Sequence, residues 1–219
     1  MKRKIVVLLL VACSLVLSGC KFNRGIAGSG VRKTEKRDLK SFNAIDTTGA
    51  YEIDVTCQKP ASFEIEADDN ILPLIKTEVR DGILFVSNDQ PYHSSKPAVL
   101  RIVLPDLNSV SSHGAGEIKI ADARSNDLRI ESTGAASVVA SGTAASVRIS
   151  SSGAGKIDTS NLRAEKARVD VNGASSIDVY ASEQLDVSVS GVGNVSYSGK
   201  PKVVNKHVSG IGSVNKKEE

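Results

Sequence analysis

Aromatic side chains are scarce in this chain. Tryptophan is absent, and phenylalanine and tyrosine together make up only 4% of the 219 residues. Proteins that bind unpaired bases commonly stack them on exposed aromatic rings. The composition therefore argues against a binding site for sugars or bases that is built on stacked rings.

A surplus of charge of one sign is also missing once the N-terminal segment is set aside. The chain has 28 basic and 25 acidic residues, and Lys2, Arg3 and Lys4 lie in a segment that we expect to be removed. The remaining 200 residues then carry 25 charges of each sign. A nucleic-acid binder needs a basic surplus to displace counterions, so we expect no nucleic-acid partner.

The only long apolar run lies near the N-terminus, at residues 5–17. It is too short to cross a membrane, which takes about 20 apolar residues, but it is typical of a signal peptide. It ends in Leu17-Ser18-Gly19-Cys20, which resembles the lipobox of bacterial lipoproteins. We expect residues 1–19 to be a cleaved signal peptide and Cys20 to carry acyl chains such as palmitate. The alternative is an ordinary signal peptide followed by an incidental cysteine.

A lipid anchor of this kind has consequences for location. One acyl chain binds a membrane only marginally and two or more hold it stably, and bacterial lipoproteins resemble one another in carrying two or three on this cysteine. Lys21 follows Cys20, and in Gram-negative cells lipoproteins without Asp at that position usually reach the outer membrane. We therefore expect a lipid-anchored protein of the cell envelope, in the outer membrane.

Cysteine is nearly absent from the expected mature protein, in which only Cys57 is a free thiol. No disulfide can form within the chain, so packing has to stabilise the domain. Cys57 follows an apparent strand at residues 51–56 and has no histidine near it in sequence. We expect it to be a small buried residue rather than a nucleophile.

The chain contains an internal repeat. Six similar segments centre on glycines spaced by 20, 19, 20, 18 and 19 residues, namely Gly114, Gly134, Gly153, Gly173, Gly191 and Gly210. An earlier relative of the pattern surrounds Gly49. Four residues after each of these seven glycines stands an aliphatic residue, namely Ile53, Ile118, Val138, Ile157, Ile177, Val195 and Val214.

Alternation of apolar and polar residues on both sides of each glycine predicts two half-buried strands per repeat. We expect the glycine to form a tight corner with positive φ, its apolar neighbour to point inward, and a looser polar connection to close the unit. Such units bury their apolar side by stacking about 4.8 Å apart. The sequence therefore predicts an all-β fold, a right-handed parallel β-helix or β-roll of 18–20-residue coils.

The rest of the chain is less regular. We expect residues 20–40 to be the lipidated N-terminus and a flexible tether, and residues 215–219 to be a charged tail. Between them, residues 41–214 form one β-helix domain, with irregular capping coils at 41–106 and regular repeats at 107–214. Asp81-Gly82 is a hairpin-type turn, and residues 70–77 are the one candidate for a short helical turn.

The sequence resembles the head GIN domain family of auto-transporter adhesins from the bacterial envelope, over roughly residues 40–214. The resemblance is carried by Phe42-Asn43-Ala44-Ile45, Leu72-Pro73-Leu74-Ile75, Gly82-Ile83-Leu84 and Gly191-Val192-Gly193-Asn194-Val195. It implies a β-helical or β-roll fold and an envelope location. It brings no catalytic residue to this chain.

One acidic grouping could carry chemistry. Stacking places Asp158 and Asp178 in one ladder, with Asp170 nearby on another strand, and pectate-lyase-type enzymes hold calcium with such carboxylates. The competing interpretation is a solvated face on which Lys156 balances the charge, and we find no matching ladder of Arg or Lys that could clamp an anionic substrate.

Metal chemistry has no better support elsewhere. His93, His113 and His207 lack the spacing of metal ligands, and the acidic turn at residues 68–70 lacks the Gly and Glu of a calcium loop. We expect no catalytic residue, metal or cofactor.

We therefore expect a non-enzymatic, lipid-anchored envelope protein that acts as an adhesin-like interaction module. Its partners would be the membrane and a polysaccharide or an envelope protein, because ladders of Ser, Thr and Asn match a repeating polymer. Two alternatives stay open: a polysaccharide-processing β-helix enzyme, and a structural or stress-related envelope component. A cleft with clustered carboxylates would favour the enzyme.

Overall fold

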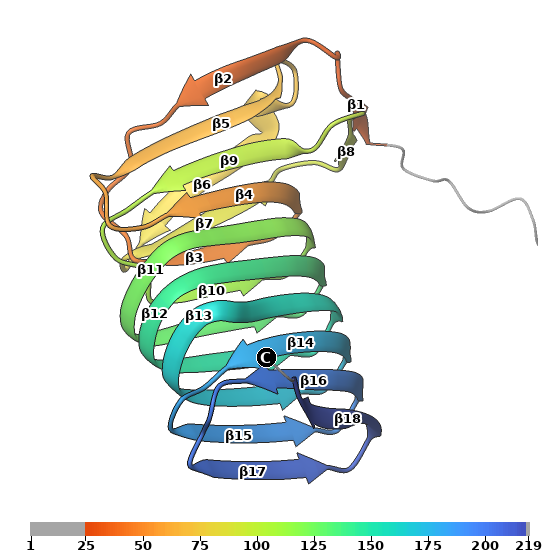
Figure 1. The fold of residues 1–219 in the computed structure, drawn as a ribbon. Coiled ribbons are helices and arrows are strands. Elements are labelled where there is room, and N and C mark those ends of the chain that lie inside the picture. Colours follow the sequence, from red (N-terminus) through yellow and green to blue (C-terminus); the bar gives the residue numbers. More distant parts are fainter. Residues whose placement is uncertain (1–24, 218–219) are drawn as a thin grey trace, which may run out of the picture.

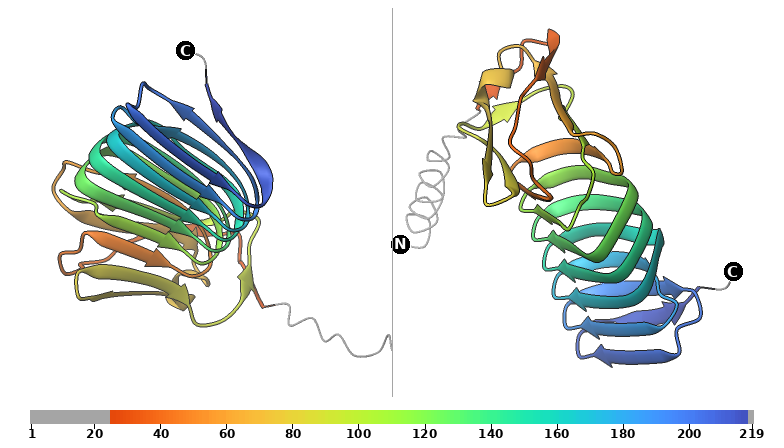
Figure 2. Two further views of the ribbon diagram at one scale, coloured as in Figure 1. Left: turned by 90° about the horizontal axis from the view of Figure 1, so that it is seen from below. Right: turned by 90° about the vertical axis from the view of Figure 1, so that its left-hand side faces the viewer.

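The computed structural model describes residues 25–217 of the chain. Its coils stack into a parallel β-solenoid, with the N-terminal part at one end and the C-terminal part at the other (Figures 1 and 2). The predicted fold class is confirmed. The expected signal peptide at 1–19 and the lipidation site Cys20 lie outside the described residues, as do residues 218 and 219 of the expected tail.

Two sheets face each other across the core. The first contains, in spatial order, β2 (Arg32–Lys36), β5 (Ser62–Asp68), β9 (Ala98–Val103), β4 (Ala50–Thr56), the first halves of β11 (Ala115–Ser132), β12 (Ala135–Ser151) and β13 (Ala154–Val171), β14 (Ala174–Tyr180), β16 (Val192–Ser198) and β18 (Ile211–Lys216). The second contains β6 (Ile75–Arg80), β7 (Ile83–Asn88), β3 (Ala44–Thr47), β10 (Ser109–Ser112), the second halves of β11, β12 and β13, β15 (Gln184–Val189) and β17 (Val203–Val208).

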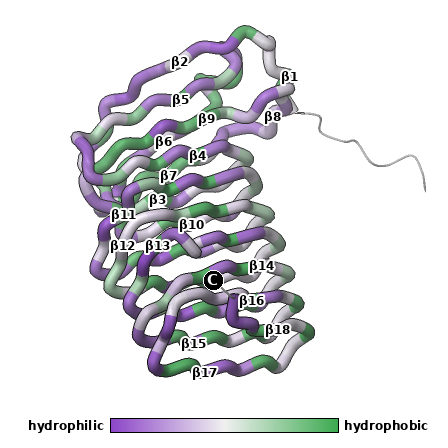
Figure 3. Tube along the Cα trace, viewed as in Figure 1, coloured by the Kyte–Doolittle hydropathy of each residue, from purple (hydrophilic) through white to green (hydrophobic). Residues whose placement is uncertain are grey.

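Aliphatic ladders fill the space between the sheets. The register sets the residues that stand four places after each pivotal glycine side by side, from Ile53 on β4 to Val214 on β18. Ile157, Ile177 and Val195 in this ladder are at most 1% exposed. The alternation of apolar and polar residues is visible along each coil in Figure 3. The predicted ladder is confirmed.

The pivotal glycines occupy the predicted corners, but for a different reason. None of the six from Gly114 to Gly210 has a positive φ. Instead, a Cβ on Gly153 would lie 1.8 Å from the carbonyl oxygen of Gly134, and the other corners approach one another as closely. The residue after each of these glycines, such as Ala154, is exposed rather than inward. Glycine is therefore required by the close stacking of successive corners.

The prediction of a looser polar connection is wrong for three coils. β11, β12 and β13 run from the first sheet into the second as continuous strands, with a register irregularity after Ile120. Inward-pointing residues make this third side part of the core, and Ala123, Leu162 and Ala164 are at most 2% exposed. The small size of the two alanines and the polar residues between the inward positions conceal the strand pattern in the sequence.

The prediction of a flexible tether up to residue 40 is also wrong for part of that segment. β1 (Ile26–Ala27) pairs with β8 (Tyr92–His93), and β2 pairs antiparallel with β5, which itself lies antiparallel to β9. The buried Asp68 carboxylate accepts hydrogen bonds from the Gly30 amide (3.2 Å) and the Ser94 hydroxyl (2.9 Å). β2 resembles a tether because, as an edge strand, it has no apolar face.

Two local predictions in the capping region are confirmed. Asp81 and Gly82 join the antiparallel strands β6 and β7, with φ angles of 51° and 75°. The short helical segment is the 3₁₀ turn η1 (Leu72–Leu74). No helix among residues 25–217 is long and apolar enough to span a bilayer.

The C-terminal end of the stack is open. In the buried ladder that includes Val169 and Val187, the last coil carries Lys206. Its ammonium group donates to the Val214 carbonyl (2.9 Å) and lies 4.9 Å from the centroid of the Tyr197 ring. A charge that points inward on an edge strand opposes pairing with another chain. The predicted tail begins later than expected, because residues 215 and 216 pair within β18.

Candidate functional site: a polar groove beside an arginine ladder

The predicted acidic grouping does not assemble as a single site. Asp158 and Asp178 are register partners on β13 and β14, as expected. Asp170 lies on the half of β13 that belongs to the second sheet, where Arg168 binds it at 3.0 Å. The three carboxylates therefore do not converge on one ion. Among residues 25–217, no group of three or more His, Cys, Asp or Glu side chains is arranged to hold a metal.

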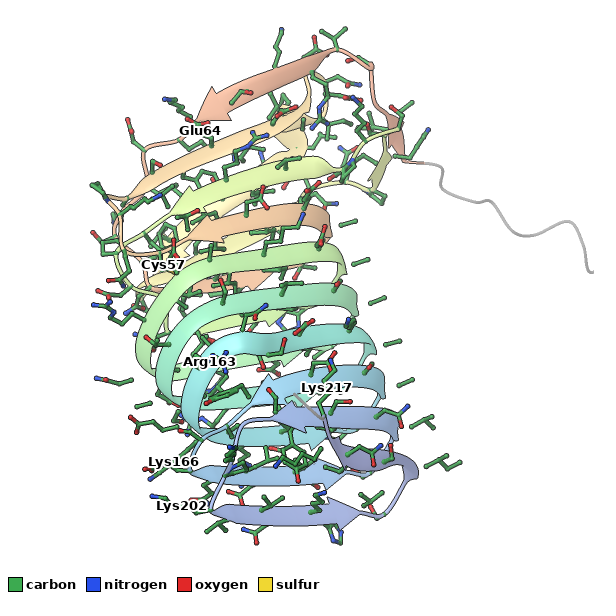
Figure 4. All side chains as sticks on the ribbon, viewed as in Figure 1. Cys57, Glu64, Arg163, Lys166, Lys202 and Lys217 are labelled. Atoms are coloured by element: carbon green, nitrogen blue, oxygen red, sulfur yellow. The ribbon has the colours of Figure 1, made fainter. Side chains whose placement is uncertain are left out.

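Lysines neutralise the acidic pair. Lys156 Nζ lies 3.8 Å from carboxylate oxygens of both Asp158 and Asp178. Lys217, which is labelled in Figure 4, has its Nζ 3.1 Å from Asp178. Partial burial raises the pKa of Asp158, but hydrogen bonds from Ser160 and the nearby lysines outweigh it and bring the pKa below its ordinary value. A carboxylate held ionised among cations fits a charge-balanced outer face.

The other candidate residues stay apart. Cys57 is fully buried, and burial, helped by the Asp122 and Asp106 carboxylates, raises the pKa of its thiol to about 11, as befits a packing residue. The histidines lie on separate elements, His93 on β8 and His207 on β17. His113 stands at a corner and joins Asp46 (3.4 Å) to the Thr133 hydroxyl (2.9 Å).

The sequence analysis found no ladder of Arg or Lys that matches the acidic grouping, and the structure contains a basic ladder that does not lie beside Asp158 and Asp178. The register places Arg129, Arg148 and Arg168 side by side on β11, β12 and β13, on the outer face of the second sheet. All three side chains are exposed. The signal is present in the sequence as an arginine at the same position of three successive strands. The ladder becomes apparent only when the repeats are aligned across the coils.

Carboxylates neutralise two of the three arginines. Arg168 binds Asp170, and Arg148 binds Asp127 on the preceding coil. Among the described residues, Arg129 forms no salt bridge, and neither does Arg124, which lies on the third side of the same coil. The ladder thus begins with a guanidinium group that no carboxylate between residues 25 and 217 engages.

A groove of about 770 Å³ adjoins that end of the ladder. Its lining is Asn43, Asp106, Asn108, Ser109, Arg124, Ser125, Asn126, Asp127 and Arg129. The groove arises because β10 begins only at Ser109, opposite Arg129, whereas β4 covers β11 only as far as Ala121. Residues 122–128 of β11 therefore have no paired strand on their N-terminal side, and the turn at 105–108 stands there instead.

The groove contains two carboxylates, which bears on the enzyme alternative. Asp127 is engaged by Arg148 and by the Ser146 hydroxyl (2.9 Å), so its oxygens are held within the protein. Asp106 lies on the turn that follows β9. An adjoining cavity of about 400 Å³ shares Asp106 and Asn43 with the groove and has an apolar wall that includes Phe42 and Leu104.

Residues 41–201 match the family model described as "Putative auto-transporter adhesin, head GIN domain". No curated protein matches the chain. A crystal structure described as a putative adhesin from Bacteroides fragilis is 28% identical, with a TM-score of 0.74, and the match covers 88% of this chain and all of that one.

Two further crystal structures share the fold, each at 18% identity over 88% of this chain and 99% of theirs. One, from Parabacteroides merdae, is described as a putative adhesin and has a TM-score of 0.57. The other, from Parabacteroides distasonis, is described as a putative lipid binding protein and has a TM-score of 0.51. The family model spans most of the solenoid, and the chain therefore belongs to the head GIN domain family of putative auto-transporter adhesins.

Proposed function

We propose that this protein is a lipid-anchored, non-enzymatic component of the cell envelope that binds a polysaccharide in the groove beside the arginine ladder. The observation that carries the proposal is the lining of the groove. Asn43, Asn108 and Asn126 bring both donors and acceptors to one open surface, which suits the hydroxyl groups of a sugar. Membership of an adhesin family supports a role in binding at the cell surface.

A binding role is favoured over catalysis by the state of the polar side chains. Asp127 is bound by Arg148 and Ser146. The acidic pair of Asp158 and Asp178 lies on the other sheet and is neutralised there by Lys156 and Lys217. Hydrolysis of a glycosidic bond ordinarily takes two carboxylates that flank the bond as acid and base or nucleophile. The polysaccharide-processing alternative would have to free Asp127 from its partners first.

The binding test uses the full chain in detergent micelles, with a panel of immobilised neutral and anionic polysaccharides. We expect retention on at least one polysaccharide without release of new reducing ends. The double variant Asn108→Ala, Asn126→Ala should weaken retention while leaving the melting temperature unchanged, because both side chains are exposed. Retention on no polysaccharide would instead favour the structural alternative, and accumulating cleavage products would favour the enzyme.

The anchor is tested at Cys20, with Lys21 after it as the basis for proposing the outer membrane in a Gram-negative host. Cys20→Ser should abolish incorporation of labelled palmitate and leave an uncleaved precursor, because serine lacks the thiol that is alkylated. Cys13→Ser, within the apolar run, is the matched control and should be processed normally. A Cys20→Ser variant that still appears in membranes at mature size would contradict the lipoprotein assignment.

A further inference from the structure

We propose that the ligand of the groove is an anionic saccharide, whose charged group is bound by Arg124 and Arg129. This inference rests on the proposed function and adds the chemical class of the ligand. It starts from the imbalance in the arginine ladder: Arg148 and Arg168 each have a carboxylate partner, whereas Arg129 has none among the described residues.

The position of Arg129 makes this imbalance significant. All three arginines have a paired strand on both sides, but in the coils of Arg148 and Arg168 the pairing continues through the preceding residues, whereas β11 is unpaired on one side just before Arg129. Arg129 stands where β10 begins, with its side chain on the wall of the groove. Arg124 enters the same groove from the third side of the coil, opposite Thr143 in register, and within residues 25–217 it also has no carboxylate partner.

The charges of the groove favour an anion over a neutral molecule. Arg124 and Arg129 face Asp106 and Asp127, but Arg148 neutralises Asp127 from the next coil. These five side chains leave one positive charge. A guanidinium group binds carboxylate or phosphate with two parallel hydrogen bonds, roughly twice as strong as neutral ones. An anionic group on the ligand would therefore neutralise the remaining positive charge and accept hydrogen bonds from the guanidinium groups.

The rest of the lining favours a saccharide over a small inorganic anion. The amides of Asn43, Asn108 and Asn126 and the carboxylate of Asp106 are suited to hydroxyl groups. A bare anion does not offer such groups. A volume of about 770 Å³ also exceeds what one small ion needs. The combination of two guanidinium groups with several amides and a carboxylate matches a sugar that carries both an acid group and hydroxyls.

The test compares hexagalacturonate with its methyl ester, which has the same backbone without the charges. Calorimetry on the full chain in detergent should detect binding of hexagalacturonate and at least about tenfold weaker binding of the ester, as expected for a hydrogen-bonded charge. Arg129→Gln and Arg124→Gln should each weaken binding of hexagalacturonate about tenfold. Arg80→Gln is the matched control, because Arg80 lies on β6 of the capping region and pairs with Glu78.

The outcomes separate this inference from the proposed function. Equal binding of acid and ester, unaffected by the arginine variants, overturns the anionic ligand but leaves polysaccharide binding standing. Retention on no polysaccharide in the panel overturns both. A phosphorylated mannan that binds in place of hexagalacturonate, with the same dependence on Arg124 and Arg129, supports the inference and places the charge on phosphate.

Discussion

Ile177→Asp is expected to destabilise the solenoid by at least about 4 kcal/mol, because it places a carboxylate in a dry interior without a partner. Ile177 is fully buried between Ile157 and Val195 in the central aliphatic ladder. Globular domains are stable by only about 5–15 kcal/mol, so this loss would remove a large fraction of the free energy of unfolding. Urea denaturation followed by circular dichroism measures the change.

The matched control is Ser176→Asp, one residue earlier. Ser176 is exposed and stands opposite Lys156 in register, so the new carboxylate meets a cation rather than the core. We expect its effect to stay within about 0.5 kcal/mol, as for most surface substitutions. Lys156→Asp would be a poor control, because Lys156 lies between Asp158 and Asp178. Equal denaturation midpoints for Ile177→Asp and Ser176→Asp would refute the assignment of inner and outer faces.

Gly153→Ala is expected to cost about 3 kcal/mol or more, at the upper end of overpacking effects. The added Cβ would lie 1.8 Å from the carbonyl oxygen of Gly134, which belongs to the backbone of the preceding coil. Gly134 is itself stacked on Gly114 in the same way, so the corner cannot yield without moving its neighbours. A rotating side chain could relieve such a clash cheaply, whereas a stacked backbone cannot.

The control for this variant is Ser152→Ala at the adjacent exposed position. It changes one side chain at the same corner without adding an atom near the backbone, so its melting temperature should match that of the wild type. The two variants can be compared by thermal unfolding under identical conditions. If Gly153→Ala and Ser152→Ala have the same melting temperature, the corners are not packed as closely as the structure describes.

The repeated part of the fold was predictable because it depends on spacing. The aliphatic ladder from Ile53 to Val214 follows directly from the recurrence of one residue type four places after each glycine. The reason for the glycines was not predictable, because close contact between coils is a property of the stack. The third side was missed for a similar reason, since Ala123 and Leu162 become an inward ladder only when coils are aligned.

The capping region and the groove were harder to predict. Strand β2 is polar on both faces and is recognisable only through β5, more than 25 residues away. The groove exists because no strand pairs with one side of residues 122–128 of β11. Strand β4 pairs only as far as Ala121, and β10 begins only at Ser109, opposite Arg129. No residue marks such an omission in the sequence. The arginine ladder, by contrast, was available from Arg129, Arg148 and Arg168 and needed only an alignment of the repeats.

Because the inward-pointing Lys206 ends the stack, the number of coils can change without any change in how the coils pack. Because each coil contacts mainly its neighbours, a whole coil duplicated before the last one would continue every ladder, keep the lysine at the end and lengthen the stack by about 4.8 Å. A coil added after Lys206 would have to bury its ammonium group. Relatives of different length could therefore evolve by internal duplication, with the cap, the groove and the terminal lysine carried along unchanged.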